Sequence, residues 1–251
     1  MQGRGSNRGS HLRRRLKQVP GARAVANWLR RTLIPHHREI HRLRRAEAGQ
    51  LLQPFPTTGE DRYPELFDAL AARLEGVAAP RILSFGCSSG EEVRALRQRM
   101  PGALIIGLDL NQRMIAKARA ADPDHAADYR CAGAPLPDEQ FDAVLALAVF
   151  RHGDLEFEQP DSCTRVLPFA RFAAGLEMLD RHLVPGGWLA LYNQQFRLSD
   201  AAIAAHYLAD PLRLTRNAPL TLLYGPDDRR IEGDSLTQPL FRKVTARPPQ
   251  C

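Results

Sequence analysis

Four short apolar runs, separated by segments of helical character, constrain the fold of this chain most strongly. The runs are Arg81–Phe85, Ala103–Asp109, Phe141–Leu147 and Trp188–Tyr192. Strands that alternate with helices of 10–15 residues form βαβ crossovers, and the resulting parallel sheet is covered by helices on both faces. The sequence therefore predicts an α/β fold with a doubly wound, mostly parallel, Rossmann-like sheet.

The intervals between these runs have apolar residues at helical spacing. Helices are expected at Pro64–Leu74, Glu91–Met100, Gln112–Ala120 and Phe169–His182. The remaining expectations are a strand at Tyr129–Ala132, a turn at Pro185–Gly187, a helix near Ala201–Leu208, and a last antiparallel strand within Pro239–Val244 at the sheet edge.

The net charge of +7 is unevenly distributed along the 251 residues. Residues 1–50 hold 13 Lys and Arg against 2 acids, whereas residues 51–251 hold 22 against 26. We therefore expect a basic, amphipathic, partly disordered helical arm over 1–50 and one domain over 51–251. The arm would either pack on the domain or contact an anionic membrane or nucleic-acid surface. The acidic balance of the domain gives no reason to expect a specific nucleic-acid substrate.

Cysteine usage and hydropathy favour a cytoplasmic protein. The four cysteines lie far apart and form no Cys-x-x-Cys pair, which predicts neither a metal site nor a disulfide framework. No apolar run approaches the roughly 18 residues that span a bilayer. A reducing compartment is therefore expected.

The loop Ser84–Glu92 is the most informative motif, because Gly86 and Gly90 allow a sharp turn and a close approach of the backbone to a ligand. A dinucleotide site is disfavoured, since Ser88 replaces the second glycine of that fingerprint and two glutamates would repel a pyrophosphate. Gly86 to Gly90 also matches the Gly-x-Ser-x-Gly nucleophile elbow, with Ser88 as nucleophile. That motif, however, follows the first strand, and no oxyanion-hole loop precedes it.

A third interpretation involves Asp109, which ends the second strand 19 residues after Gly90. A carboxylate there can accept two hydrogen bonds from a ribose diol. It could also cap the following helix. A ligand with a ribose, a sulfonium and an amino-acid end would suit this loop, which offers no phosphate donors.

With these blocks in order, the chain resembles the class I S-adenosylmethionine-dependent methyltransferases. The resemblance extends over about 66–198 and includes Ile82–Glu91, Ile106–Asp109, Leu136–Leu145 and Leu183–Leu189. It implies S-adenosylmethionine as cofactor, with its methionine end surrounded by Gly86, Cys87, Ser88 and Gly90. It further implies that Asp109 binds the ribose, and that Leu110, Cys131 and Ala132 lie at the adenine. Members of the family commonly have an acidic residue near the end of the third strand, where it contacts the adenine. The nearest acid in this chain, Asp128, is shifted from that position.

The acceptor is expected after the fourth strand, where His152 would act as a general base or as a structural histidine. Tyr192 and Asn193 end the fifth strand and are candidate acceptor contacts. The connection 155–168 is long enough for a lid, and its acids would attract a cationic acceptor or lie in solvent. The Asn/Asp-Pro-Pro-Tyr/Phe signature of amide and base nitrogen methylation is absent from the sequence.

The expected function is methyl transfer to the oxygen or nitrogen of a small molecule. Two other enzymes stay open: a protein carboxylate methyltransferase, because Gly86–Glu92 is similar to the first motif of chemotaxis-receptor methyltransferases, and an esterase that uses Ser88. A module that binds the cofactor and a partner without turnover is a third alternative.

Overall fold

The computed structural model describes residues 52–55, 58–124, 126–214, 222–232 and 236–244. The predicted basic arm, residues 1–50, lies outside these residues. Within them, the chain alternates helices and strands in the following order: α4 (Pro64–Leu74), β1 (Arg81–Phe85), α5 (Glu91–Arg99), β2 (Leu104–Asp109), α6 (Gln112–Ala120), β3 (Asp128–Cys131), β4 (Phe141–Leu147), α7 (Gly153–Glu158), α8 (Phe169–Arg181) and β5 (Leu183–Tyr192). The α/β prediction is confirmed.

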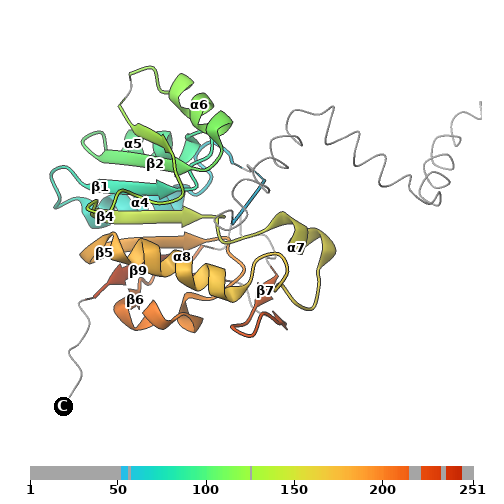
Figure 1. Ribbon diagram of the computed structural model, residues 1–251. Coiled ribbons are helices and arrows are strands. Elements are labelled where there is room, and N and C mark those ends of the chain that lie inside the picture. The colour runs from blue at the N-terminus through green and yellow to red at the C-terminus, as the bar shows by residue number, and fades with distance from the viewer. Residues whose placement is uncertain (1–51, 56–57, 125, 215–221, 233–235, 245–251) are drawn as a thin grey trace, which may run out of the picture. The chain divides into compact units, whose positions relative to one another are not determined.

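The main sheet has seven strands in the order β3-β2-β1-β4-β5-β9-β6, where β9 is Leu240–Lys243 and β6 is Tyr207–Ala209 (Figure 1). The first five strands run parallel, and β9 runs antiparallel to both of its neighbours. The strand order reverses between β1 and β4, so the crevice for a ligand lies at their carboxyl ends.

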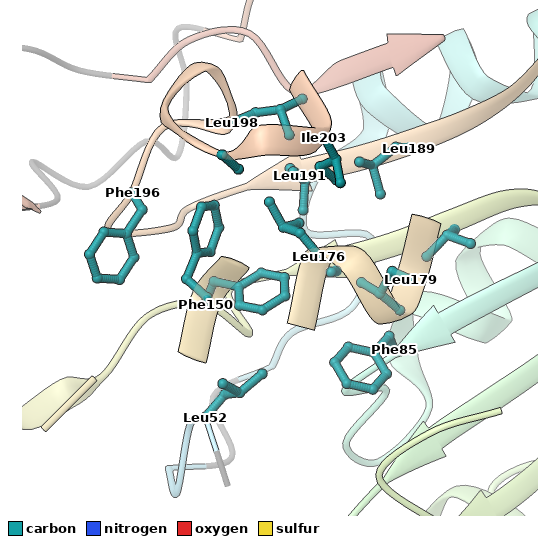
Figure 2. Packing of buried hydrophobic residues seen from close by; sticks show 14 of the residues in the cluster. Leu52, Phe85, Phe150, Leu176, Leu179, Leu189, Leu191, Phe196, Leu198 and Ile203 are labelled. Carbon is teal, nitrogen blue, oxygen red and sulfur yellow. The ribbon is translucent and has the colours of Figure 1, made fainter. Parts of the chain in front are cut away.

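Alternate residues of the central strands face two separate layers of helices. One apolar cluster joins Ile82 and Leu145 to α4, α5 and α6, and the other joins Leu83 and Val144 to α8. Figure 2 shows Leu176 of α8 beside the β5 strand in this second cluster. Helices therefore cover both faces, as the apolar runs predict.

Local sequence explains where the helices begin. Pro64 occupies the first turn of α4, where its missing N–H costs nothing. Asn111 caps α6, since its side chain accepts hydrogen bonds from the N–H groups of Arg113 at 3.1 Å and Met114 at 3.3 Å. The first turn of α5 holds Glu91 and Glu92, which suit the positive end of the helix dipole.

Four expectations for the carboxyl-terminal half of the chain are wrong in detail. Pro185–Gly187 lies inside β5, where the pairing with β4 is irregular. The expected helix near 201–208 is a short 3₁₀ helix, Ala202–His206, followed by β6. The antiparallel strand β9 is not the sheet edge, because β6 pairs with its far side. The expected irregular connection 155–168 begins within α7. No helix among the described residues is long and apolar enough to cross a membrane.

Candidate active site

The glycine loop after β1 is tied to β2 by two backbone hydrogen bonds. The N–H groups of Gly86 and Cys87 donate to the Leu108 carbonyl at 2.8 and 2.9 Å. Gly86 and Gly90 have φ of +77° and +83°, which favour glycine. A Cβ on Gly86 would lie 2.5 Å from Cγ2 of Val149, so the loop after β4 packs directly on the glycine loop.

Cys87 contributes only its backbone to this loop. Its side chain is 3% exposed and points toward Gly107, where an added Cβ would lie 2.9 Å from its sulfur. Burial raises the pKa of the Cys87 thiol, and the negative charge of Asp109 raises it further. The thiol therefore stays protonated and unreactive at neutral pH.

Ser88 also presents its backbone, because its N–H donates to Oδ2 of Asp109 at 2.9 Å. Its hydroxyl is buried and has no hydrogen-bond partner among the described residues. A serine nucleophile needs an adjacent base, and no described histidine or carboxylate bonds this hydroxyl. The structure therefore does not favour the esterase alternative, and the orphaned hydroxyl is instead available to a ligand.

Asp109 is held in place by both of its oxygens. Besides the bond from Ser88, Oδ1 accepts the N–H of Asn111 at 2.7 Å. Burial raises the pKa of Asp109, while these two backbone hydrogen bonds oppose the rise. The helix cap is Asn111, so the interpretation of Asp109 as a cap is wrong. Each Asp109 oxygen keeps a free lone pair that can accept from a diol.

The residues expected at the adenine lie beside Asp109. Cys131 is the register partner of Asp109 across β2 and β3, and its thiol lies 3.6 Å from the Leu110 carbonyl oxygen. Ala132 follows on the same edge and packs against the buried cluster. Asp128 pairs with Ile106 at the opposite end of β3, too far along the strand to replace the missing acid.

Glu92 is a site residue that the sequence interpretation missed. Its Oε1 accepts a hydrogen bond from the Ser84 hydroxyl, with 2.7 Å between the two oxygen atoms. Its side chain lines a small pocket with Gly86, Ser88 and Tyr63. Burial raises the pKa of Glu92 to about 7. The sequence contained one signal for this role, namely a serine near the end of β1 that lies eight residues before a glutamate. We call this space the donor pocket.

A second, larger space adjoins the donor pocket and is called here the acceptor cavity. Its volume is about 440 Å³, and its walls include Phe55, Arg62, Arg151, Asp154 and Glu156. Cavities of this size suit small molecules. Arg62 lines both spaces. The residues before α4, which form one wall of each, were not predicted as part of the site.

The structure places His152 next to this cavity rather than in its described walls. It caps α7: its Nδ1 accepts the Asp154 N–H at 3.2 Å, and its own N–H donates to Oε1 of Gln195 at 2.9 Å. Its ring meets Phe55 edge-on at 6.1 Å between centroids. These contacts give it a structural role, and its role as a base stays a prediction.

The residues at the end of β5 form hydrogen bonds with other residues of the site and of the core. Asn193 accepts from Nη1 of Arg151 at 2.6 Å and donates from Nδ2 to the Tyr63 hydroxyl at 3.3 Å. The Tyr192 ring packs edge-on against Tyr63, and its hydroxyl donates to the Leu214 carbonyl at 3.4 Å. Asn193 thus connects the two sides of the site, whereas Tyr192 points into the core.

Three residues with a strained backbone lie at the carboxyl ends of the strands. Ser88, Ala148 and Asn193 have φ of +50°, +59° and +58°, and they lie in the loops after β1, β4 and β5. Side-chain-bearing residues keep such conformations only where their surroundings enforce them, most often at functional sites. The three loops therefore converge on one strained, concave site at the switch point.

A family model described as a methyltransferase domain matches residues 83–191, from β1 to β5. The part of the chain from β1 to β5 is thus identified as a methyltransferase domain. The matched span contains the glycine loop, Asp109 and the loop after β4. The expected methyltransferase domain and the α/β fold class are therefore confirmed, and S-adenosylmethionine is the cofactor that such a domain implies.

Individual relatives match over part of their length. A trans-aconitate 2-methyltransferase of Methylobacterium nodulans is 32% identical over 49% of this chain and 41% of its own. Another from Azoarcus sp. is 29% identical over 74% of this chain and 64% of its own. The solved N-methyltransferase NodS of Bradyrhizobium japonicum has 14% identity and a TM-score of 0.47, over 74% and 99% of the two chains. This chain thus spans less than two thirds of both curated relatives.

Proposed function

We propose that this protein transfers a methyl group from S-adenosylmethionine to a small molecule bound in the acceptor cavity. The observation that carries the proposal is the shared wall at Arg62, which joins a donor pocket built on the glycine loop to a cavity of about 440 Å³. Both curated relatives are named for a small carboxylic acid acceptor, which supports a small molecule over a protein substrate.

Residues of the donor side fit each part of the cofactor. Asp109 would bind the ribose diol, and Leu110, Cys131 and Ala132 would lie along the adenine. Gly86, Gly90, the Cys87 backbone and the orphaned Ser88 hydroxyl would surround the methionine end. The Glu92 carboxylate would stabilise the positive charge of that end.

When bound, S-adenosylmethionine supplies a methyl group that its sulfonium has already activated. The protein has to align the acceptor with that methyl group and exclude water. Close packing of Val149 against Gly86 would keep the loops after β1 and β4 together, and residues of α7 line the acceptor cavity. We further propose a cytoplasmic location, because Cys87, Cys131 and Cys163 are free thiols.

Isothermal titration with S-adenosylhomocysteine tests the donor site in the full chain. We expect binding by the wild type and at least about tenfold weaker binding by Asp109→Asn, because a charged acceptor of hydrogen bonds is lost. Asp138→Asn, an exposed carboxylate outside both pockets, is the matched control and should bind normally. Unchanged affinity in Asp109→Asn would refute its ribose role.

A further inference from the structure

Tyr63, the residue before α4, is a buried residue in the wall of the donor pocket. It is only 3% exposed. Its ring packs edge-on against Phe67 and Tyr192, with 6.5 and 5.2 Å between the ring centroids. Edge-on contacts are a favoured geometry of aromatic pairs. The packing of the core therefore determines where the Tyr63 hydroxyl lies.

The direction of two hydrogen bonds shows what this hydroxyl can still do. Arginine has only donors, so Nη1 of Arg151 donates to Oδ1 of Asn193 at 2.6 Å. This bond orients the amide, and Nδ2 of Asn193 donates to the Tyr63 oxygen at 3.3 Å. The Tyr63 oxygen is thus the acceptor, and its O–H group still has a hydrogen to donate. Among the described residues, the hydroxyl forms no other hydrogen bond.

The charges that act on the Tyr63 hydroxyl belong to the donor pocket. Burial raises the pKa of Tyr63, whereas the positive charge of Arg62 and the hydrogen bond from Asn193 lower it. The negative charge of Glu92 raises this pKa further. Arg62 and Glu92 both line the donor pocket. Glu92 accepts its hydrogen bond from Ser84 and not from Tyr63. The phenol therefore keeps its proton at neutral pH and can donate it in a hydrogen bond to a ligand in this pocket.

The donor pocket thus offers two groups of opposite hydrogen-bonding sense to the amino-acid end of the cofactor. The ionised carboxylate of Glu92 only accepts hydrogen bonds, which suits an ammonium group. The Tyr63 hydroxyl has a hydrogen to donate, and of the two charged groups at this end only the carboxylate accepts one. A buried donor without an acceptor is costly, so a charge-assisted bond to a carboxylate is favourable here.

Resting on the proposed function, we propose that Tyr63 is a cofactor-binding residue whose hydroxyl donates a hydrogen bond to the carboxylate of the methionine end. Glu92 receives the ammonium group of the same end. The two side chains together recognise an amino acid in its doubly charged form and hold it beside the glycine loop. Because aromatic packing fixes the Tyr63 ring, the hydroxyl keeps its place even without its bond to Asn193.

Isothermal titration of the full chain with two ligands tests this role, at a pH above the pKa of Glu92. The first ligand is S-adenosylhomocysteine, and the second is decarboxylated S-adenosylhomocysteine, which keeps the ammonium group and lacks the carboxylate. Tyr63→Phe keeps the ring and removes the hydroxyl. We expect this variant to bind S-adenosylhomocysteine about tenfold more weakly than the wild type, because a hydrogen bond to a charged group is lost. It should bind the decarboxylated ligand as tightly as the wild type does.

Two further variants separate the carboxylate contact from other effects. Tyr207→Phe is the matched control and should leave both affinities unchanged, because the Tyr207 hydroxyl donates to Asp180 at 2.8 Å and lines neither pocket. Glu92→Gln should weaken the binding of both ligands, since both carry the ammonium group. If Tyr63→Phe binds S-adenosylhomocysteine as the wild type does, or loses affinity for both ligands equally, the role of Tyr63 is wrong. If the wild type binds neither ligand, the proposed function is wrong and the role of Tyr63 falls with it.

Discussion

The donor pocket and the acceptor cavity share Arg62 but are built in different ways. The donor side consists of backbone groups and buried carboxylates, which two glycines of fixed conformation and the ends of β1 and β2 hold in place. The acceptor side consists of charged side chains from α7 and from the segment before α4. A change at the glycines of the donor side therefore disturbs the fold, whereas a change of a charged side chain on the acceptor side can leave the fold intact.

The largest expected effect compares two glycines that have the same φ of +83°. In Gly90→Ala the new Cβ would lie 2.8 Å from the Tyr129 hydroxyl and 3.1 Å from Cβ of Ala118, whereas at Gly186 nothing lies within 4 Å. Gly186→Ala should lower the free energy of unfolding by about 1 kcal/mol through backbone strain alone. Gly90→Ala should lower it by about 3 kcal/mol, since crowding adds to the strain. Urea unfolding measures both, and equal losses would show that crowding at the donor loop is unimportant.

The next effect concerns the charge of Glu92, which also faces Arg62, Tyr63 and the Ser84 hydroxyl. Its pKa of about 7 means that the carboxylate ionises between pH 6 and 8. The affinity for S-adenosylhomocysteine, whose ammonium group is positive, should therefore rise about tenfold over this range as protons are released. Glu92→Gln should bind weakly at all pH values in this range.

The pH dependence of stability has the opposite sign. Because the folded pKa of Glu92 lies above the ordinary value of 4.5, the native state holds the proton more strongly. Its contribution to stability is present at pH 4.5 and is lost as the pH rises to about 7. Glu92→Gln should remove this decline, and Glu91→Gln is the neighbouring control. A wild-type titration without any pH dependence of affinity would contradict the role of Glu92.

The sequence predicted the shape of the glycine loop and the position of Asp109 at a strand end, because these signals are local. The conformations of Gly86 and Gly90, and the strand end at Asp109, follow from short patterns in one βαβ unit. Glu92 was missed because its importance depends on burial against Ser84, which no pattern of charges reveals. The acceptor side was predicted poorly for a related reason. Arg62 and Arg151 come to line one cavity only through tertiary packing, because they are 89 residues apart in the sequence.

A smaller effect is expected at Asn193, which connects Arg151 to Tyr63. Asn193→Gly keeps the positive φ without strain but removes both side-chain hydrogen bonds. The free energy of unfolding should fall by about 1–2 kcal/mol because Arg151 and Tyr63 each lose a hydrogen bond, and S-adenosylhomocysteine affinity should stay the same. Urea unfolding and titration with S-adenosylhomocysteine measure the two results separately, and a weaker affinity for S-adenosylhomocysteine would place Asn193 on the donor side.

The smallest effect is expected where the acceptor cavity meets a movable side chain. A Cβ on Gly153, the first residue of α7, would lie 2.8 Å from Cδ2 of Phe55, and φ there is not positive. The ring can turn aside, so Gly153→Ala should change the free energy of unfolding by less than about 1 kcal/mol. The displaced ring would reshape the wall of the acceptor cavity, and the affinity for S-adenosylhomocysteine should not change. Phe55→Leu, which leaves room for the methyl group, should reverse the effect of Gly153→Ala in the double variant. Additive losses would instead show that α7 itself moves, and the acceptor side would then be as rigidly built as the donor loop.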